Sequence, residues 1–276
     1  MPKLRLIQAP PFCDRVVHHA LVRVIGEAFG KKIIADTYAC IKGRGTHAAS
    51  RRLRDFMQGE RAKRRGHPFF VLKADISKYF PNINHDILMR TIRRTVYDTR
   101  TLWLIERIIK SNGFTDKGVP IGALTSQLFA NVYLDAFDHF MKETMRIRSY
   151  IRYMDDFVIL HHDKEALQGI QRSIEQYMGD HLLLRLNPKT SIFPDKNGID
   201  FSGYRHWTSH TRPRKRTTKR MRRQTANLKR KYAAGLIGVE DITPRMASFA
   251  GYMKHCDGHI TAQTIFDDAI FMRRTA

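Results

Sequence analysis

The chain has 276 residues, of which 49 are Lys or Arg and 26 are Asp or Glu, so its formal net charge is +23. Hydrophobic residues make up 42 % and charged residues 27 %, a globular composition that excludes a disordered or fibrous protein. A charge this positive favours a polyanionic partner, and nucleic acid is the commonest. The length predicts about two domains, or one large domain with an appendage.

Several other protein classes are disfavoured by short sequence features. No stretch reaches the roughly 18 uninterrupted apolar residues of a membrane span, and the N-terminus lacks the apolar core of a secretory signal, so we expect a soluble, cytoplasmic protein without membrane contact. Cys13, Cys40 and Cys256 are odd in number and far apart, so no disulfide framework is expected. The histidines in 161–162 and 254–259 lack a second ligand pair at zinc spacing, and we predict no zinc.

The first basic cluster along the chain runs from residue 42 to residue 65 and contains Gly43 and Gly45 near its start. Glycines between cations allow backbone amides to approach a phosphate closely. The cluster therefore suits a phosphate-binding loop. An ordinary basic surface loop is the alternative.

Three apolar segments have strand character. Residues 69–76 form a compact apolar run in which Asp75 is the carboxylate, while 150–153 and 157–160 flank a Met-Asp-Asp sequence and predict a hairpin with two acids at its tip. Between these segments, apolar residues at spacings of four and five predict a helix from about Thr125 to Arg146. Helices and a small antiparallel sheet without regular βαβ alternation indicate an α+β fold.

The adjacent carboxylates Asp155 and Asp156 are predicted at the edge of a sheet core, where their repulsion costs free energy unless a cation is present. Asp75 lies beside them if the three strands share one sheet. Three carboxylates suit two Mg²⁺ ions, with Mn²⁺ as a possible substitute, and two such ions support nucleotidyl transfer. For any single aspartate, a turn or strand-end cap is the alternative.

The second basic cluster lies between Arg212 and Lys231, where twenty residues contain eleven Lys or Arg and no acid. A solvated, partly flexible segment is one interpretation of such a run. An apolar-periodic stretch follows it, so a basic helical appendage resting on a core is the better interpretation.

Two motifs identify a family. The sequence from Tyr153 to Asp156 resembles the YxDD box of reverse transcriptases, and the sequence from Asp75 to Phe80 resembles their first catalytic-aspartate motif, in the same order and with a typical separation. The correspondence extends from roughly Asp14 to Tyr252.

This resemblance implies a right-hand polymerase with three parts. We expect fingers and N-terminal region at 1–70, a palm at 71–205 with a fingers insertion at about 86–118, and a small basic helical thumb at 206–276. It implies RNA-directed DNA polymerase activity, with Asp75, Asp155 and Asp156 as catalytic residues that also bind metal. Ile76 is implied as a further metal ligand.

Other motifs imply contacts with the nucleotide. The segment containing Lys42 and Arg44 is similar to the fingers motif that holds the incoming triphosphate, so these two side chains are expected to clamp phosphate. The Leu-Asn-Pro-Lys-Thr sequence at 186–190 resembles the motif whose lysine approaches the leaving pyrophosphate, which assigns Lys189 as acid or electrostatic stabiliser. Phe80 occupies the position of an aromatic ring beneath the sugar of a deoxynucleoside triphosphate.

The sequence Phe-Ser-Gly-Tyr at 201–204 resembles the primer grip, usually Phe-Leu-Gly-Tyr, so Ser202 departs from the pattern and is expected to weaken local packing. The implied primer-grip residues are Phe201, Gly203 and Tyr204. The basic helix takes the place of the thumb, which tracks the phosphates of a primer–template duplex of DNA and template RNA. The expected duplex-binding residues are Arg214, Lys215, Arg216, Lys219, Arg220, Arg222 and Arg223.

The segment 117–127 narrows the subclass, because most relatives carry Gln-Gly and Ser-Pro where this chain has Ile121-Gly and Ser-Gln127. Both residues are expected near the nucleotide. The variant resembles reverse transcriptases of diversity-generating retroelements, which implies error-prone cDNA synthesis from a template-repeat RNA together with a small basic accessory protein. Maturase, endonuclease and RNase H segments are not recognised, which disfavours intron mobility. A bacterial antiphage reverse transcriptase and a non-catalytic RNA-binding scaffold are the alternatives.

Overall fold

The computed structural model describes residues 10–111, 113, 115–267 and 269–273. The first nine residues of the expected fingers range, including the N-terminus considered above for a secretory signal, lie outside the described part. The last three residues of the expected thumb range also lie outside it.

A four-stranded antiparallel sheet forms the centre of the molecule, in the order β2-β3-β1-β4. Its strands are β1 (Phe70–Asp75), β2 (Tyr150–Tyr153), β3 (Asp156–His161) and β4 (Ser191–Pro194). The predicted hairpin and the predicted placement of the first strand in the same sheet are both confirmed, because β3 pairs with β2 on one side and with β1 on the other.

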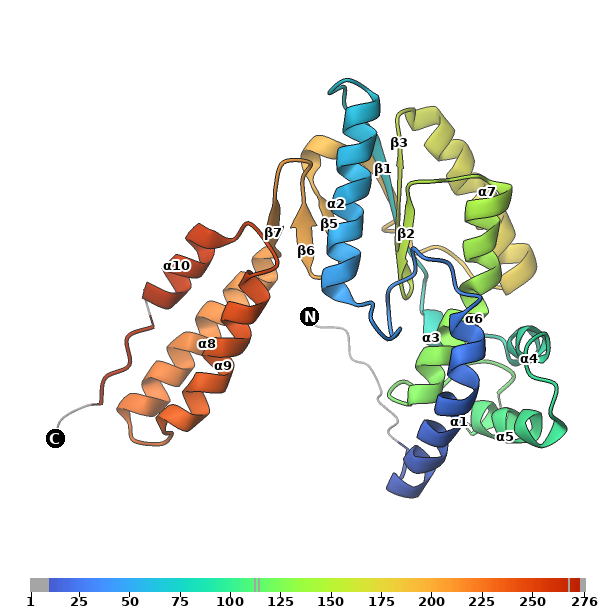
Figure 1. The fold of residues 1–276 in the computed structure, drawn as a ribbon, viewed down its shortest axis with the longest axis horizontal. Helices are drawn as coiled ribbons and strands as arrows, with labels where there is room; N and C mark the ends of the chain where they lie inside the picture. Colours follow the sequence, from blue (N-terminus) through green and yellow to red (C-terminus); the bar gives the residue numbers. More distant parts are fainter. Residues whose placement is uncertain (1–9, 112, 114, 268, 274–276) are drawn as a thin grey trace.

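Alternation along the strands divides the core between the two faces of this sheet. Leu72 and Ala74 belong to the larger core, with α6 (Leu124–His139) and α7 (Lys164–Leu182) on that side. Val71 belongs to a second core with α2 (Thr46–Lys63). Figure 1 shows α2 on one side of the strands and α6 and α7 on the other.

The predicted helix 125–146 is confirmed in position, but it changes type. The α-helix α6 ends at His139 and a π-helix, Phe140–Thr144, continues it. The residue spacing of five noted in the sequence occurs here, since the amide of Met145 donates to the carbonyl of Phe140 at 2.9 Å. Helix α6 is buried on most of its circumference rather than along one stripe.

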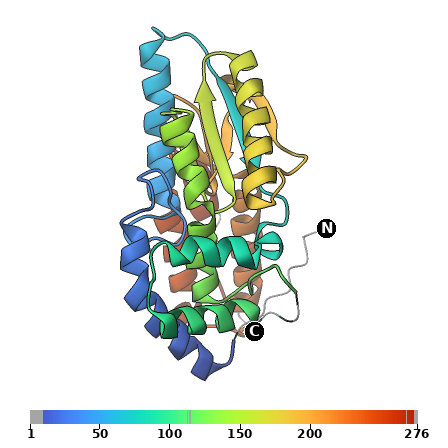
Figure 2. The same cartoon turned by 90° about the vertical axis from the view of Figure 1, so that its right-hand side faces the viewer.

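The remaining helices next to the larger core are α1 (Phe12–Gly30), the short α3 (Tyr79–Asn82), α4 (His85–Arg93) and α5 (Thr99–Lys110). Helix α1 packs against α6, and α4 packs against both α5 and α6. Figure 2 shows α4 and α5 crossing below the sheet on the side facing the viewer.

A second, three-stranded antiparallel sheet connects this body to the C-terminal helices. It contains β5 (Ile199–Phe201), β6 (Tyr204–His206) and β7 (Thr211–Pro213), and a short 3₁₀ helix, Asp195–Asn197, precedes it. Ser202 and Gly203 have φ angles of 47° and 92°, the backbone of a two-residue hairpin turn.

The C-terminal helices are α8 (Lys215–Ala233), α9 (Val239–Met253) and α10 (His259–Asp267), which share a small core around Met221, Met253 and Ile265. The predicted basic helical appendage is therefore present, and Figure 1 shows it as an arm beside the rest of the molecule. Among the described residues, helices that combine the length and apolarity of a membrane crossing are absent. All three cysteines are free thiols.

Candidate active site

The three predicted catalytic aspartates lie at one end of the central sheet. Asp75 is the last residue of β1 and pairs across the ladder with Asp156, the first residue of β3. Asp155 is in the β2–β3 turn, next to Met154, whose φ angle is 58°. The amide of Ile76 donates to the carbonyl of Asp155 at 3.1 Å, so the turn is tied directly to the end of β1.

The carboxylates of the three aspartates do not converge on one point. The Lys73 ammonium forms an ion pair with the Asp156 carboxylate. Burial and the nearby Asp75 raise the pKa of Asp156, and Lys73 opposes them by favouring the charged form. In the described part of the chain, three acidic, histidine or cysteine side chains close enough to share a metal ion do not occur.

The donor chemistry of this site nevertheless fits Mg²⁺, because aspartate oxygens on adjacent strands are the hard ligands that this ion prefers. Burial, the main cause of the raised pKa of Asp156, disfavours its charged form, and Lys73 offsets this effect only in part. Lys73 provides the only cation paired with Asp156 among the described ion pairs. A divalent cation there would compensate charge that Lys73 compensates only in part.

Asn187 holds Asp75 from the side opposite Asp156. Its backbone amide donates to the Asp75 carbonyl at 2.7 Å, and its side-chain Nδ2 donates to Asp75 Oδ2 at 3.0 Å. Its Oδ1 accepts from the amide of Lys189 at 3.0 Å. The structure thus places the exposed Lys189 in the loop attached to Asp75. The positioning role of Asn187 was missed from the sequence, although it lies within a motif that was recognised.

A buried ion pair lies beneath the hairpin turn. Arg152 donates from Nε and Nη2 to the two carboxylate oxygens of Asp138, at 2.7 and 2.6 Å, and both side chains are fully buried. The Tyr150 and Thr37 hydroxyls donate to the same carboxylate at 2.6 and 2.7 Å. The pKa of Arg152 is raised: burial opposes its charge, and the adjacent carboxylate outweighs that effect.

The same arginine reaches the turn that carries Asp155. Its Nη1 donates to the carbonyl of Met154 at 2.9 Å and to Asn131 Oδ1 at 3.3 Å. Asn131 in turn donates to the carbonyl of Ala39 at 2.8 Å. Arg152 therefore connects the turn that carries Asp155 to helix α6 and to the loop before α2.

Phe80 lies on α3, five residues after Asp75, and packs against the larger core. The amide of Val119 donates to the Phe80 carbonyl at 3.1 Å. This bond brings the segment that contains Ile121 beside Phe80. Ile121 precedes α6 and Gln127 lies in its first turn, and both are half-buried.

The predicted phosphate clamp is partly engaged in other contacts. Arg44 donates from Nη1 to the carbonyls of Ile34 and Thr37, at 2.7 and 2.9 Å, so its guanidinium holds the preceding loop. Lys42 is exposed. Arg44 thus has a structural contact that its sequence motif does not reveal.

The primer-grip motif forms the β5–β6 hairpin. Ser202, at the position where weaker local packing is expected, is buried and donates to the carbonyl of Thr46 at 3.0 Å. The Ser202 hydroxyl donates to a backbone carbonyl of α2, and the leucine usual at this position has no side-chain donor for that bond. Phe201 and Tyr204 are buried, and Tyr252 of α9 stacks on Tyr204 and donates to the carbonyl of Gly203.

The basic helix α8 has one buried face, formed by Met221, Thr225 and Leu228, toward the other C-terminal helices. Arg214, just before the helix, is partly engaged, because its Nε lies 3.1 Å from Asp200 Oδ1. The other six predicted duplex-binding cations point to solvent: Lys215, Arg216, Lys219, Arg220, Arg222 and Arg223.

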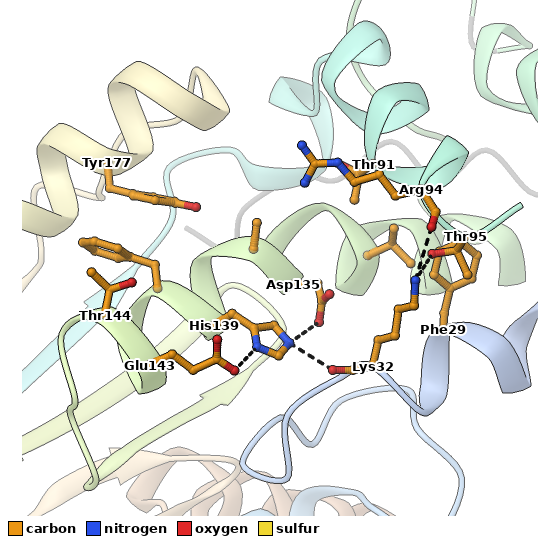
Figure 3. Close-up of a pocket in the computed structure, with 13 residues that line it drawn as sticks. Phe29, Lys32, Thr91, Arg94, Thr95, Asp135, His139, Glu143, Thr144 and Tyr177 are labelled. Carbon is orange, nitrogen blue, oxygen red and sulfur yellow. Dashed lines mark hydrogen bonds and ion pairs between the residues drawn. The ribbon is translucent and has the colours of Figure 1, made fainter.

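A hollow of about 400 Å³ lies apart from the aspartates, between the end of α1, α4, α6 and α7. Figure 3 shows His139 between Asp135, Glu143 and the backbone of Lys32. Its Nδ1 lies 2.6 Å from Glu143 and its Nε2 lies 3.0 Å from the Lys32 carbonyl, so both nitrogens face acceptors. Burial alone would lower the pKa of His139, but these acceptors raise it. The hollow is lined by none of the three predicted catalytic aspartates.

Comparison with known proteins places this geometry in a family context. The family model described as reverse transcriptase (RNA-dependent DNA polymerase) matches residues 1–206. Protein YkfC of Escherichia coli (strain K12) is 27 % identical over 243 residues, which cover 74 % of this chain and 63 % of YkfC. The group II intron-encoded protein LtrA of Lactococcus lactis subsp. cremoris is 25 % identical over 203 residues, covering 70 % of this chain and 32 % of LtrA.

Solved structures support the α+β fold. Apo telomerase from Candida tropicalis, truncated from the C-terminal domain, superimposes with a TM-score of 0.52 at 14 % identity, covering 72 % of this chain and 44 % of the telomerase chain. Telomerase from Candida albicans in complex with a fragment of telomeric RNA gives 0.51 at 13 % identity, covering 78 % and 43 %. The chain spans less than two thirds of the length of each of these relatives.

Proposed function

This chain belongs to the reverse transcriptase (RNA-dependent DNA polymerase) family, and from that premise we propose that it synthesises DNA on an RNA template. One observation carries the proposal. Asp75 and Asp156 are direct cross-strand partners at the end of the central sheet, and Asp155 lies in the adjoining turn. Adjacent carboxylates at a sheet edge are stable together when divalent cations bind them.

In this proposal Asp75, Asp155 and Asp156 hold two Mg²⁺ ions, with the backbone of Ile76 nearby. When bound, the ions neutralise phosphate charge and favour attack by the primer 3′-hydroxyl on the α-phosphate. Asn187 fixes the orientation of Asp75 through its two hydrogen bonds. Lys189, on the same loop, stabilises the leaving pyrophosphate or protonates it.

We assign the incoming nucleotide to the residues around Phe80. The ring beneath the sugar would collide with a 2′-hydroxyl, which selects deoxynucleotides. Lys42 is free to reach the triphosphate from an exposed position. Arg44 also binds the triphosphate in this proposal, from a loop that it stabilises by donating to the carbonyls of Ile34 and Thr37.

The duplex is assigned to the second sheet and the C-terminal helices. Phe201, Gly203 and Tyr204 shape the hairpin that positions the primer, and the exposed cations of α8 contact backbone phosphates. This assignment divides the chain into fingers at 1–70, palm at 71–205 with an insertion at about 86–118, and thumb at 206–276.

We propose further that the enzyme is of the diversity-generating type, which copies a template-repeat RNA with errors at adenine and works with a small basic accessory protein. Ile121 and Gln127 support this subclass. Because Ile121 lies in the segment bonded to Phe80, its apolar side chain replaces a hydrogen-bonding group beside the proposed nucleotide site. One lost hydrogen bond is worth about 0.5–1.5 kcal/mol, so Ile121 contributes roughly tenfold at most to infidelity. An antiphage reverse transcriptase is the second candidate, since some of these also carry Ser-Gln.

Primer extension on an RNA template with Mg²⁺ and the four deoxynucleotides tests both levels of the proposal. cDNA synthesis supports the polymerase, and its absence with all components present contradicts it. Sequencing the product then separates the subclasses. Errors concentrated opposite template adenine, and fewer of them in Ile121→Gln, support the diversity-generating type, whereas uniformly accurate copying in the presence of the accessory protein contradicts it.

A further inference from the structure

The outer face of helix α5 carries an unusual combination of side chains. Arg100, Trp103, Arg107 and Lys110 follow each other at spacings of three and four residues, and all four are exposed. The opposite face, with Ile105, Ile108 and Ile109, is buried in the larger core. We call these four exposed residues the α5 outer face.

Trp103 is the centre of this face. Its side chain is 60 % exposed, and the guanidinium of Arg107 lies over the ring at 5.2 Å from its centroid. A large ring left in water gains nothing for folding, because its apolar surface remains hydrated. Neither the packing of α5 nor its capping by Asp98 uses the exposed part of this ring.

A second hollow adjoins the α5 outer face. It has a volume of about 380 Å³ and lies between α4 and α5, with Arg90, Arg93 and Lys110 among its lining residues. Asp86 and Glu106 also line it, but Glu106 is paired with Lys110 at 2.6 Å. Two arginines therefore contribute positive charge at a hollow one helix turn away from the exposed ring.

This surface is separate from the proposed duplex site. In Figure 1, α4 and α5 lie at the opposite end of the molecule from α8 and α9. Figure 2 agrees, because α4 and α5 face the viewer while the C-terminal helices lie behind them. A strand bound on α5 would thus be additional to the duplex held by the thumb.

We propose that the α5 outer face and the adjoining hollow bind single-stranded nucleic acid. A base stacks on Trp103 between Arg100 and Arg107, and Arg90 and Arg93 contact a neighbouring phosphate. Exposed aromatic rings framed by cations are how sequence-tolerant single-strand sites are built. Given the proposed function, on which this inference rests, the strand is the unpaired part of the template RNA that is not being copied.

A protein partner would also use an exposed tryptophan and arginines. The balance of charge favours nucleic acid, because the α4–α5 region from His85 to Lys110 contains six Arg or Lys against three acids. Of these acids, Glu106 is paired with Lys110 and Asp98 caps α5. Five arginines, against the single further acid Asp86, are left to meet an anionic strand.

The test uses the fluorescence of Trp103, which needs no catalysis. The chain has two tryptophans, so Trp207→Phe leaves Trp103 as the only one. We expect an unpaired oligouridylate of about 12 nucleotides to quench this fluorescence saturably. If Trp207→Phe does not fold, the difference in quenching between the unmodified protein and Trp103→Phe replaces it.

Affinity changes complete the test. Trp103→Ala is expected to weaken oligonucleotide binding by roughly 5- to 150-fold, the range for one stacked base. Arg100→Gln with Arg107→Gln should weaken it as well, whereas Arg172→Gln, an exposed arginine on α7, should not. The proposal would be overturned if Trp103→Phe showed the same quenching as the unmodified protein, and if Trp103→Ala and the Arg100→Gln, Arg107→Gln variant bound the oligonucleotide with the parental affinity.

Two further comparisons identify the bound strand and separate this site from the proposed function. Stronger binding of RNA than of DNA with the same sequence supports template RNA as the source, and equal or stronger DNA binding supports the displaced cDNA instead, both through the same stacking chemistry. A protein that fails to extend primers but shows Trp103 quenching loses the proposed function and keeps this site. A protein that extends primers without Trp103 quenching loses this site alone.

Discussion

The buried pair Arg152–Asp138 gives the sharpest prediction about stability. Both side chains are fully buried, and the carboxylate accepts from two nitrogens of Arg152 and from the hydroxyls of Tyr150 and Thr37. Arg152→Met leaves Asp138 as a buried anion with only neutral donors. Breaking a buried pair in this way costs about 3–5 kcal/mol.

That cost is a large part of the total free energy of unfolding, which is about 5–15 kcal/mol for a typical protein. The melting temperature should fall by roughly 6–20 °C, at about 2–4 °C per kcal/mol for a chain of this size. Asp138→Asn alone should also destabilise the protein, because it leaves the Arg152 guanidinium buried with a weaker partner. The Asn side chain still offers an acceptor to Tyr150 or Thr37.

The combination of the two changes tests the reasoning. In the Arg152→Met background, Asp138→Asn removes the uncompensated charge, so it should stabilise the protein by about 1–3 kcal/mol although it destabilises the parent. Urea denaturation of the four proteins, followed by circular dichroism, measures this coupling. If Asp138→Asn destabilises both backgrounds equally, the ion pair is not the source of the stability.

Three other predictions concern pH and salt. Burial lowers the pKa of His206 to about 4, so between about pH 6.5 and pH 4 the unfolded chain binds a proton that the folded chain does not. The free energy of unfolding should therefore fall by about 3 kcal/mol on acidification through that range. In urea titrations, His206→Gln should lose this part of the pH dependence. Lys73 favours the charged form of Asp156, so Lys73→Met should move the acidic limb of the kcat/KM profile to higher pH; an unmoved limb, or the same movement in Lys164→Met, would contradict the pairing. Changing Arg220, Arg222 and Arg223 to Ala should flatten the salt dependence of duplex affinity by about one unit of log–log slope per lost phosphate contact, and an unchanged slope would place the duplex elsewhere.

The central sheet was predictable because its signals are local. Apolar runs of strand length end at Asp75 or flank Asp155 and Asp156, and the carboxylates beside these strands led to the prediction of a metal site there. The basic helix α8 was predictable for the same reason, since its charges are contiguous in the sequence.

The supporting contacts were not predictable, because they join distant segments. Asp138 is one acid among several near the end of α6, and only the folded chain shows that it meets Arg152 inside the core. Ser202 interrupts a motif in the sequence, yet it finds an acceptor at Thr46, far away in the chain. Arg44 matches a phosphate-binding motif, and its contacts with backbone carbonyls appear only in three dimensions.

The most direct test of the account is Mg²⁺-dependent primer extension by Asp155→Asn. The change removes one charge from the proposed metal ligands while keeping the size of the side chain, and Asp180→Asn, an exposed position on α7, is the matched control. We expect Asp155→Asn to abolish extension and to retain RNA binding, and Asp180→Asn to retain both. Extension by Asp155→Asn at the parental rate would contradict catalysis by two metal ions at this sheet edge.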